Sequence, residues 1–258
     1  MPVLFVGHGS PMNAIENNVY AQSWITMGKR LPTPKAILCL SAHWYIHGTH
    51  ILGTEKPETI HDFWGFPEEL YKQSYPAPGA PGLARDIQKL LDHTSVTWDL
   101  GWGFDHGTWS VTKRLFPEAN IPTSQLSIDY SKPSTFHYDL GKKLAALRSQ
   151  GVLILGSGNI VHNLGLVRFE EDAKPFEWAE EFDATARQLI EKRDHQKLCD
   201  YESLGKAAQL SIPTPDHYLP LLISLGATTT KDELSYFCSG IEFGSVSMTA
   251  CLFSEEPL

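Results

Sequence analysis

The chain has 258 residues, of which 42% are hydrophobic and 20% are charged, and its 21 basic and 30 acidic side chains give a net charge of −9. This composition excludes an intrinsically disordered chain, because it supplies enough apolar surface to fill a core. An acidic chain without a run of Lys and Arg also lacks the electrostatic footprint of a nucleic-acid-binding protein.

Short apolar runs alternate with amphipathic stretches along the chain. Continuous apolar runs of four or five residues are typical of strands that are buried on both faces of a sheet. The alternation predicts an α/β fold, with a single domain over residues 1–258 and a central, largely parallel or mixed sheet covered by helices on both faces. In chain order we predict a strand at Val3–Val6, a helix at Asn18–Leu31, a strand at Ala36–Leu40, helices at Gly82–Leu91 and Lys142–Gln150, a strand at Val152–Leu155, a helix at Trp178–Lys192 and a helix that begins near His217.

Three histidines follow the predicted strands. His8, His43 and His162 each come shortly after an apolar run, in loops that contain Gly or Ser. Ligand sites in open α/β sheets lie beyond the carboxyl ends of the strands, so we expect these side chains to converge. His217 follows a Pro-containing loop, where Asp216 is either the N-cap of the next helix or a partner of the histidine. Taken singly, each histidine also fits an exposed turn, a buried core position or a capping site.

Two further histidines lie in segments rich in Gly and aromatic residues. His106 is in a pocket loop or a surface turn, and His61 is on a pocket wall or at the edge of the core. The sequence contains no HExxH, zinc-finger, GxSxG or phosphate-loop motif. A mononuclear metal site built from dispersed histidines therefore fits best; two histidines and a carboxylate would favour Fe(II), and histidines alone would suit zinc or iron. The other histidines are expected to be exposed or structural: His47, His50, His93, His137 and His195.

The sequence also predicts where the protein works. No segment reaches the ~20 apolar residues of a membrane span, and the N-terminal residues enter a strand pattern without the basic region of a signal peptide. Cys39, Cys199, Cys238 and Cys251 show no CxxC spacing, which favours a reducing compartment. We expect a cytoplasmic monomer or homodimer that has no membrane or nucleic-acid partner.

Seven collinear motifs together resemble the DOPA 4,5-dioxygenase family, which are class III extradiol ring-cleavage dioxygenases of the LigB superfamily. Each motif is short, but the set runs in order over nearly the whole chain and is specific in combination. The motifs are GHGSPM at 7–12, SAHW at 41–44, HDFWGFP at 61–67, YPAPG at 75–79, GFDHG at 103–107, SGNIVHN at 157–163 and PTPDHYLP at 213–220.

The resemblance implies a metal centre and assigns roles to its residues. His8, His43 and His217 match the positions that hold one divalent metal ion, with Fe(II) expected for dioxygenase activity and Zn(II) expected as an occupant of the isolated protein. His162 matches an acid/base histidine that is also a candidate additional zinc ligand, and His106 matches a histidine that orients substrate or oxygen. Better-known superfamily members use a carboxylate where this chain has His217; Glu242 and Asp105 are the candidates if a carboxylate is required.

The expected reaction inserts O₂ into the ring of a small aromatic diol, a DOPA-like catechol, and gives a muconic semialdehyde. Aromatic side chains near the histidines are expected to bind the ring, namely Trp44, His61, Phe63 and Trp64. Two alternatives use the same fold: a zinc-dependent hydrolase and a non-enzymatic interaction protein. The second alternative predicts a degenerate ligand set, whereas every histidine that the resemblance requires is present here.

Overall fold

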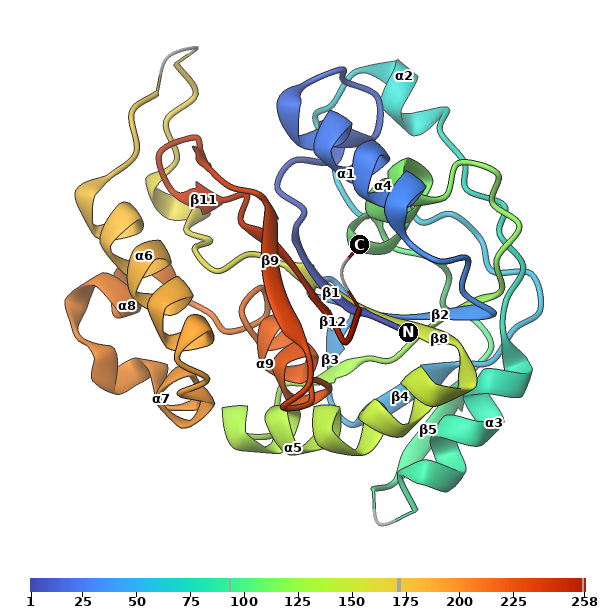
Figure 1. The fold of residues 1–258 in the computed structure, drawn as a ribbon. Coiled ribbons are helices and arrows are strands. Elements are labelled where there is room, and N and C mark those ends of the chain that lie inside the picture. The colour runs from blue at the N-terminus through green and yellow to red at the C-terminus, as the bar shows by residue number, and fades with distance from the viewer. Residues whose placement is uncertain (93, 171–172, 257) are drawn as a thin grey trace.

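A six-stranded mixed sheet forms the centre of the protein (Figure 1). The structure is a computed structural model that describes residues 1–92, 94–170, 173–256 and 258. The first four strands in the order are mutually parallel, whereas β12 runs antiparallel to both of its neighbours. Across the sheet the strands are β6 (Thr123–Gln125), β2 (Ala36–Ser41), β8 (Val152–Gly158), β1 (Val3–Gly7), β12 (Ala250–Ser254) and β9 (Glu233–Cys238).

The register of the parallel strands brings their carboxyl ends together. In β1 and β8 the pairing runs as far as Gly7 opposite Gly158, and in β2 and β8 as far as Ser41 opposite Ser157. Every residue of these three strands is buried, as their continuous apolar sequences predict. The loops that follow the three strands therefore start side by side at one edge of the sheet.

Helices cover both faces of this sheet, as predicted. Alternate residues of a strand point to opposite faces, so Val3 and Phe5 join one hydrophobic cluster while Leu4 and Val6 join another. The second cluster receives α1 (Val19–Arg30) and α4 (His106–Leu115). The first cluster receives α3 (Pro81–Leu90), α5 (Ser134–Leu144), α6 (Glu177–Glu191), α7 (His195–Cys199), α8 (Lys206–Ser211) and α9 (Leu219–Gly226).

The remaining elements are short, and a third hydrophobic cluster packs beside the loops of the carboxyl edge. A third cluster of buried side chains, which includes Trp44, Phe104 and Trp109, supports the loops on the side of α2 (Glu68–Tyr71). Among the described residues, three two-stranded ladders and four 3₁₀ helices complete the fold. They are β3 (Tyr45–Ile46) with β7 (Ile128–Asp129), β4 (Thr49–Leu52) with β5 (Val96–Asp99), β10 (Ile241–Glu242) with β11 (Val246–Ser247), and η1 (Pro11–Ala14), η2 (Ala145–Gln150), η3 (Leu164–Leu166) and η4 (Tyr201–Leu204).

Most predicted elements are confirmed, and one helix is corrected. The predicted helices at 18–31, 82–91 and 178–192 are α1, α3 and α6, and Asn18 caps α1 by accepting a hydrogen bond from the N–H of Ala21. The prediction at 142–150 was wrong, because α5 begins at Ser134 and the segment after Leu144 is the 3₁₀ helix η2. Gly141 interrupts the helical sequence pattern of α5, but α5 needs a glycine there: a Cβ atom would lie 2.1 Å from the carbonyl oxygen of Ile223 in α9.

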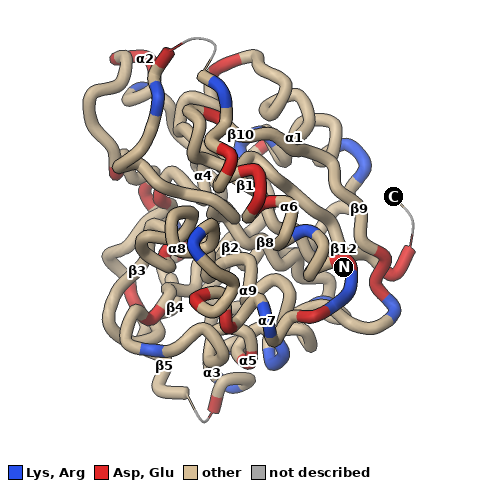
Figure 2. Tube along the Cα trace, turned by 90° about the vertical axis from the view of Figure 1, so that its left-hand side faces the viewer, with Lys and Arg blue, Asp and Glu red and all other residues tan. Residues whose placement is uncertain are grey.

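The structure also bears on the cysteines, the distribution of charge and the possibility of a membrane-spanning helix. All four cysteines are free thiols, and Cys39 is a fully buried core residue of β2. Basic and acidic residues are interspersed along the chain trace (Figure 2). Across the described residues, no helix combines the length and the apolar character that are needed to span a bilayer.

Candidate metal centre

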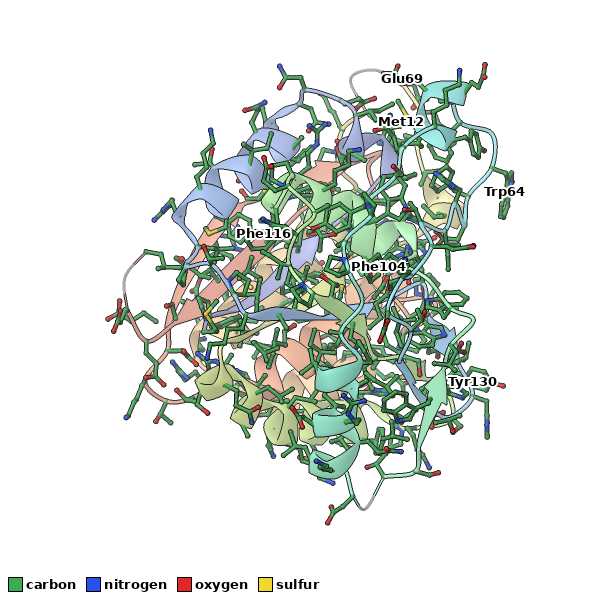
Figure 3. The ribbon with its side chains drawn as sticks, turned by 90° about the vertical axis from the view of Figure 1, so that its right-hand side faces the viewer. Met12, Trp64, Glu69, Phe104, Phe116 and Tyr130 are labelled. Carbon is green, nitrogen blue, oxygen red and sulfur yellow. The ribbon has the colours of Figure 1, made fainter. Side chains whose placement is uncertain are left out.

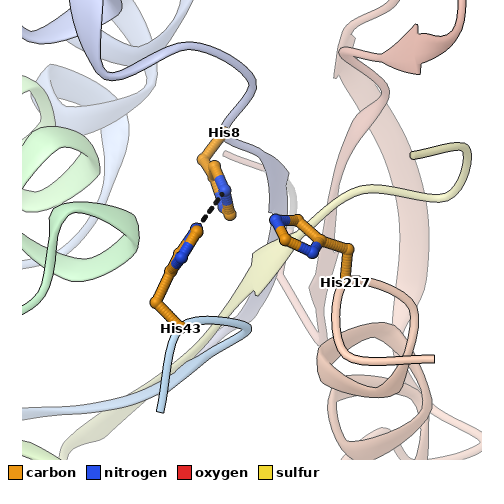
Figure 4. A group of neighbouring side chains, drawn as sticks. All are labelled: His8, His43 and His217. Carbon is orange, nitrogen blue, oxygen red and sulfur yellow. Dashed lines mark hydrogen bonds between the residues drawn. The ribbon is translucent and has the colours of Figure 1, made fainter. Parts of the chain in front are cut away.

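Three histidines meet at the carboxyl edge of the sheet. His8 directly follows β1, and its N–H donates to the carbonyl oxygen of Gly158 at the end of β8 (3.0 Å). His43 lies two residues beyond β2. His217 enters from the opposite side, two residues before α9, and its carbonyl oxygen accepts from the N–H of Asn159 (2.8 Å). Figure 4 shows the three rings pointing toward one another.

The three rings are close enough to share one ion. The Nε2 atoms of His8 and His43 are 3.1 Å apart, and the ring centroid of His217 lies 5.2 Å from that of His8 and 5.0 Å from that of His43. One nitrogen from each of the three rings lies within 4.8 Å of the other two. His8 and His217 are buried, and His43 is partly buried.

The second ring nitrogen of His8 is held by a serine. His8 Nδ1 lies 3.0 Å from Ser157 Oγ. The hydroxyl of Ser157 donates its proton to the carbonyl oxygen of Gly107 at 2.5 Å, so the same oxygen accepts from His8 Nδ1–H. This network assigns the proton of a neutral His8 to Nδ1 and leaves the lone pair on Nε2, which faces the other histidines.

Carboxylates hold the other two rings. His43 Nδ1 lies 3.4 Å from Asp62 Oδ2, and His217 Nδ1 contacts Asp216 Oδ2. Burial opposes ionisation of both carboxyls, but hydrogen bonds from His106 to Asp62 and from His217 to Asp216 outweigh it and lower both pKa values. Each ligand ring is therefore oriented through one nitrogen, which is the usual arrangement around metal-binding histidines.

The electrostatic environment keeps the donor nitrogens of His8 and His43 free of protons. Burial first, and then the neighbouring histidines, lower the pKa values of His8 and His43 well below 6.5. Metal binding requires neutral imidazole, so these rings are already in the state that binds a cation. Three imidazoles that are each oriented through one ring nitrogen fit a divalent transition metal with open coordination positions.

Two more of the predicted histidines flank this cluster. His106 begins α4; its backbone N–H donates to Asp62 Oδ1 (2.8 Å), its Nδ1 lies 3.0 Å from Asp62 Oδ2, and its ring is 3.8 Å from that of His43. His162 stacks on His217 with a centroid distance of 3.4 Å. Burial and the charge of His217 lower the pKa of His162 to about 2. The structure thus brings together the five histidines that the resemblance placed at the metal centre: His8, His43, His106, His162 and His217.

Comparison with known proteins assigns this arrangement to a family. The family model described as the catalytic LigB subunit of aromatic ring-opening dioxygenase matches residues 4–243. The chain belongs to the LigB family. It is therefore an extradiol ring-cleavage dioxygenase of the oxidoreductase class, and membership of the LigB family implies a divalent metal at the histidine cluster.

Individual LigB relatives match over almost their whole length. The "4,5-DOPA dioxygenase extradiol" of Escherichia coli K12 is 47% identical over 255 residues, which cover 96% of this chain and 93% of the relative. The protein of the same name from Beta vulgaris is 36% identical over 258 residues, which cover 95% of this chain and 96% of the relative. A crystal structure of an uncharacterized E. coli K12 protein superposes with a TM-score of 0.87 at 42% identity and covers 98% of this chain and 100% of its own.

The two carboxylates considered as LigB-type metal ligands lie outside the group of three histidines. The fully buried Asp105 accepts hydrogen bonds from Ser41 Oγ (2.6 Å) and Gln125 Nε2 (2.8 Å), and it caps α4 through the N–H of Thr108. Burial and nearby Asp62 raise its pKa to about 6. Within the described chain, no group of mutually close metal-ligand atoms contains Asp105 or Glu242.

Of the aromatic residues expected to bind the substrate, some lie beside the histidines and others do not. Phe63 lies beside the site, with its ring centroid 5.6 Å from that of His106, and His61 packs against Phe63 at 5.7 Å. Trp44 is only 1% exposed, and its ring stacks on Trp102 in the third hydrophobic cluster. Trp64 is 87% exposed and points away from the body of the protein (Figure 3).

The remaining histidines do not join the cluster. The buried His137 and His195 bond the carbonyl oxygen of Asp129 and the hydroxyl of Tyr138, which are structural contacts. His47 is exposed and His50 is partly buried, whereas His93 lies outside the described residues.

Sequence reasoning missed Asp62 as a partner of the site. The HDFWGFP motif contains this acid directly after His61, and the sequence analysis assigned a role to His61 but not to Asp62. Ser157 is a second partner that sequence reasoning missed, and the structure shows that it orients His8.

Proposed function

We propose that this dioxygenase opens the ring of a DOPA-like catechol at one divalent metal ion that His8, His43 and His217 hold. The observation that carries the proposal is the convergence of these three imidazoles, each oriented through its other nitrogen by Ser157, Asp62 or Asp216. Bound Fe(II) would supply the redox chemistry that joins a catecholate to O₂, whereas Zn(II) has no accessible second redox state.

His162 is the base in this proposal. Its burial keeps the imidazole neutral, so a ring nitrogen is free to accept the proton of a catechol hydroxyl. The carboxylate of Asp216 acts in the opposite direction to burial and favours the protonated ring. A negative charge that develops on the substrate oxygen has the same effect, so the basicity of His162 rises when the substrate is bound.

His106 orients the substrate or oxygen in this proposal. Asp62 bonds both the backbone N–H and the Nδ1 atom of His106, which fixes the ring at the start of α4. The Nε2 atom is then left for the reacting oxygens. Because the same carboxylate contacts His43, Asp62 couples the position of His106 to the position of a metal ligand.

Phe63 supplies the aromatic wall for the substrate ring, and His61 and Phe66 pack against it. Trp44 supports this wall from the core, because its ring is buried against Trp102. The product would be a muconic semialdehyde that retains both oxygen atoms of O₂. No external reductant is then required.

Anaerobic reconstitution tests the proposal. The chain is loaded with one equivalent of Fe(II), metal binding is verified, and DOPA and air are then added. We expect a yellow semialdehyde together with the uptake of one O₂ for each DOPA consumed. The Zn(II)-loaded chain is the control, and it should bind DOPA without consuming oxygen. A fully Fe(II)-loaded chain that gives neither colour nor oxygen uptake would contradict the proposal.

A further inference from the structure

Glu242 carries a carboxylate whose Oε2 atom has no hydrogen-bond partner among the described residues. It lies on β10, and its Oε2 atom is shielded from solvent without accepting a hydrogen bond. No basic side chain of the described residues forms an ion pair with it. Burial first, and then the nearby Glu16, raise its pKa to about 7. A buried acceptor in this state destabilises the fold, so its presence calls for a functional reason.

The strand register places Glu242 on the same side as the histidines. Glu242 pairs with Val246 across the β10–β11 ladder, and Val246 in turn bridges to His162. Directly opposed residues of antiparallel strands project from the same face, so the side chains of Glu242 and His162 share a face two strand spacings apart, roughly 10 Å. His162 stacks on His217 on this face.

The other side of Glu242 borders the loop of His8. A Cβ atom on Gly9 would lie 3.3 Å from Glu242 Oε2 and 2.4 Å from Met248 Sδ, and Gly9 has a φ of +56°. Only glycine adopts this conformation readily and leaves the space in front of the carboxylate open. Glu242 therefore lies between the segments that carry His8 and His162, beside the metal centre but outside its ligand set.

We propose that Glu242 receives the ammonium group of an amine-bearing catechol and thereby determines the preference of the site for cationic side chains. This inference rests on the proposed function, because it concerns the substrate of the same site. Among the described residues, Glu242 belongs to no group of neighbouring metal-ligand atoms. A carboxylate without other ligands beside it suits an ammonium group better than a metal ion. In DOPA the ammonium group is separated from the catechol ring by a short flexible chain, so that the two can occupy neighbouring subsites.

The test compares two catechols that differ only in the amine. The Fe(II)-loaded chain is assayed with DOPA and with 3-(3,4-dihydroxyphenyl)propionic acid. Charge-assisted hydrogen bonds of this kind correspond to about a ten- to hundredfold effect. We expect Glu242→Gln to lower kcat/KM for DOPA by that factor and to change kcat/KM for the amine-free acid by less than about threefold. Glu233→Gln, at an exposed position of β9, is the matched control and should change neither value.

Binding under anaerobic conditions gives a second readout that is independent of turnover. The affinity ratio of the two catechols should fall toward one in Glu242→Gln, and the melting temperature of this variant should be equal to or higher than that of the wild type. An equal loss for both catechols, or no change in either, would overturn the inference while leaving the ring-opening activity in place. If the wild type opens neither ring, the proposed function fails, and the binding ratio still decides the role of Glu242.

Discussion

The Nε2 atoms of His8 and His43 face each other at 3.1 Å, although the two residues follow different strands. Ser157 places the proton of a neutral His8 on Nδ1, and Asp62 favours the same for His43. Two lone pairs would then repel each other, and a shared cation removes this repulsion. Nitrogens that bind one tetrahedral ion at ~2.0–2.1 Å are separated by roughly 3.3 Å, so the rings already have a ligand-like spacing.

This geometry predicts which histidines retain the metal. We expect His8→Ala, His43→Ala and His217→Ala each to abolish stoichiometric metal binding, because two imidazoles without the third bind a divalent ion weakly. His106→Ala should keep one equivalent of metal and lose turnover, because its ring contacts Asp62 and lies outside the group of three. Metal content after dialysis, measured by elemental analysis, checks the prediction.

The matched control is His47→Ala, which removes an exposed imidazole and should retain both metal and activity. Full metal occupancy in His217→Ala would remove that residue from the ligand set. Loss of metal in His106→Ala would instead place His106 within the set.

The hydroxyl of Ser157 should contribute to metal affinity without touching the metal. Ser157→Ala removes the acceptor that orients His8 Nδ1, and the loss of such a partner typically lowers metal affinity by about 10- to 100-fold. Titration of the metal-loaded chain with a competing chelator measures the effect. Ser149→Ala, which removes an exposed hydroxyl on η2, should leave the affinity unchanged. Equal affinities in the two variants would show that the Ser157 contact has no influence on the ligand.

The sequence predicted the convergence of His8, His43 and His162 for a physical reason. Each follows a continuous apolar run, and such runs become adjacent parallel strands whose carboxyl ends share an edge. His217 had no comparable signal in the pattern of strands, and the family motif identified it. Local sequence thus predicted the edge of the sheet on which the site lies.

Features that depend on distant partners could not be predicted in this way. Trp44 and Trp64 look equally suitable for stacking on a substrate, but Trp102, far along the chain, packs on the first, and the second is 87% exposed. Asp62 lies in an irregular loop, and only the fold brings it to His106 and His43. Gly141 allows α5 to approach α9 closely, and the sequence of α5 alone does not reveal this contact.

The close contact of α5 and α9 predicts that a single added methyl group lowers the unfolding free energy substantially. A Cβ atom on Gly226 would lie 2.1 Å from the carbonyl oxygen of Tyr138, so Gly226→Ala must push the two helices apart. Overpacking of this kind costs about 1–3 kcal/mol of unfolding free energy. Gly82→Ala in α3 is the control, because no atom lies within 4 Å of its added methyl group and helix formation should gain about 0.5–1 kcal/mol. Urea unfolding measures both values, and a neutral Gly226→Ala would show that the helices separate without cost.

Stability should fall as the pH is lowered below neutrality, in part because of His137. Burial lowers the pKa of this histidine from 6.5 to about 4, although a hydrogen bond with the carbonyl oxygen of Asp129 acts in the opposite direction. Between these two values the unfolded chain binds a proton that the folded chain does not, so the contribution is fully present above pH 6.5 and is lost as the pH falls through about 4. The difference between these two pKa values corresponds to about 3 kcal/mol of unfolding free energy.

Other buried histidines act in the same direction, so the comparison of variants isolates His137. With a chelator present throughout, the unfolding free energy of His137→Gln should fall less between pH 7.5 and pH 4.5 than that of the wild type, by about 2–3 kcal/mol. Glutamine keeps a side-chain donor for the carbonyl oxygen of Asp129 but does not titrate. His47→Gln, at an exposed position, should follow the wild-type curve. Identical pH dependence of His137→Gln and the wild type would mean that His137 becomes protonated at the same pH in the folded and unfolded chains.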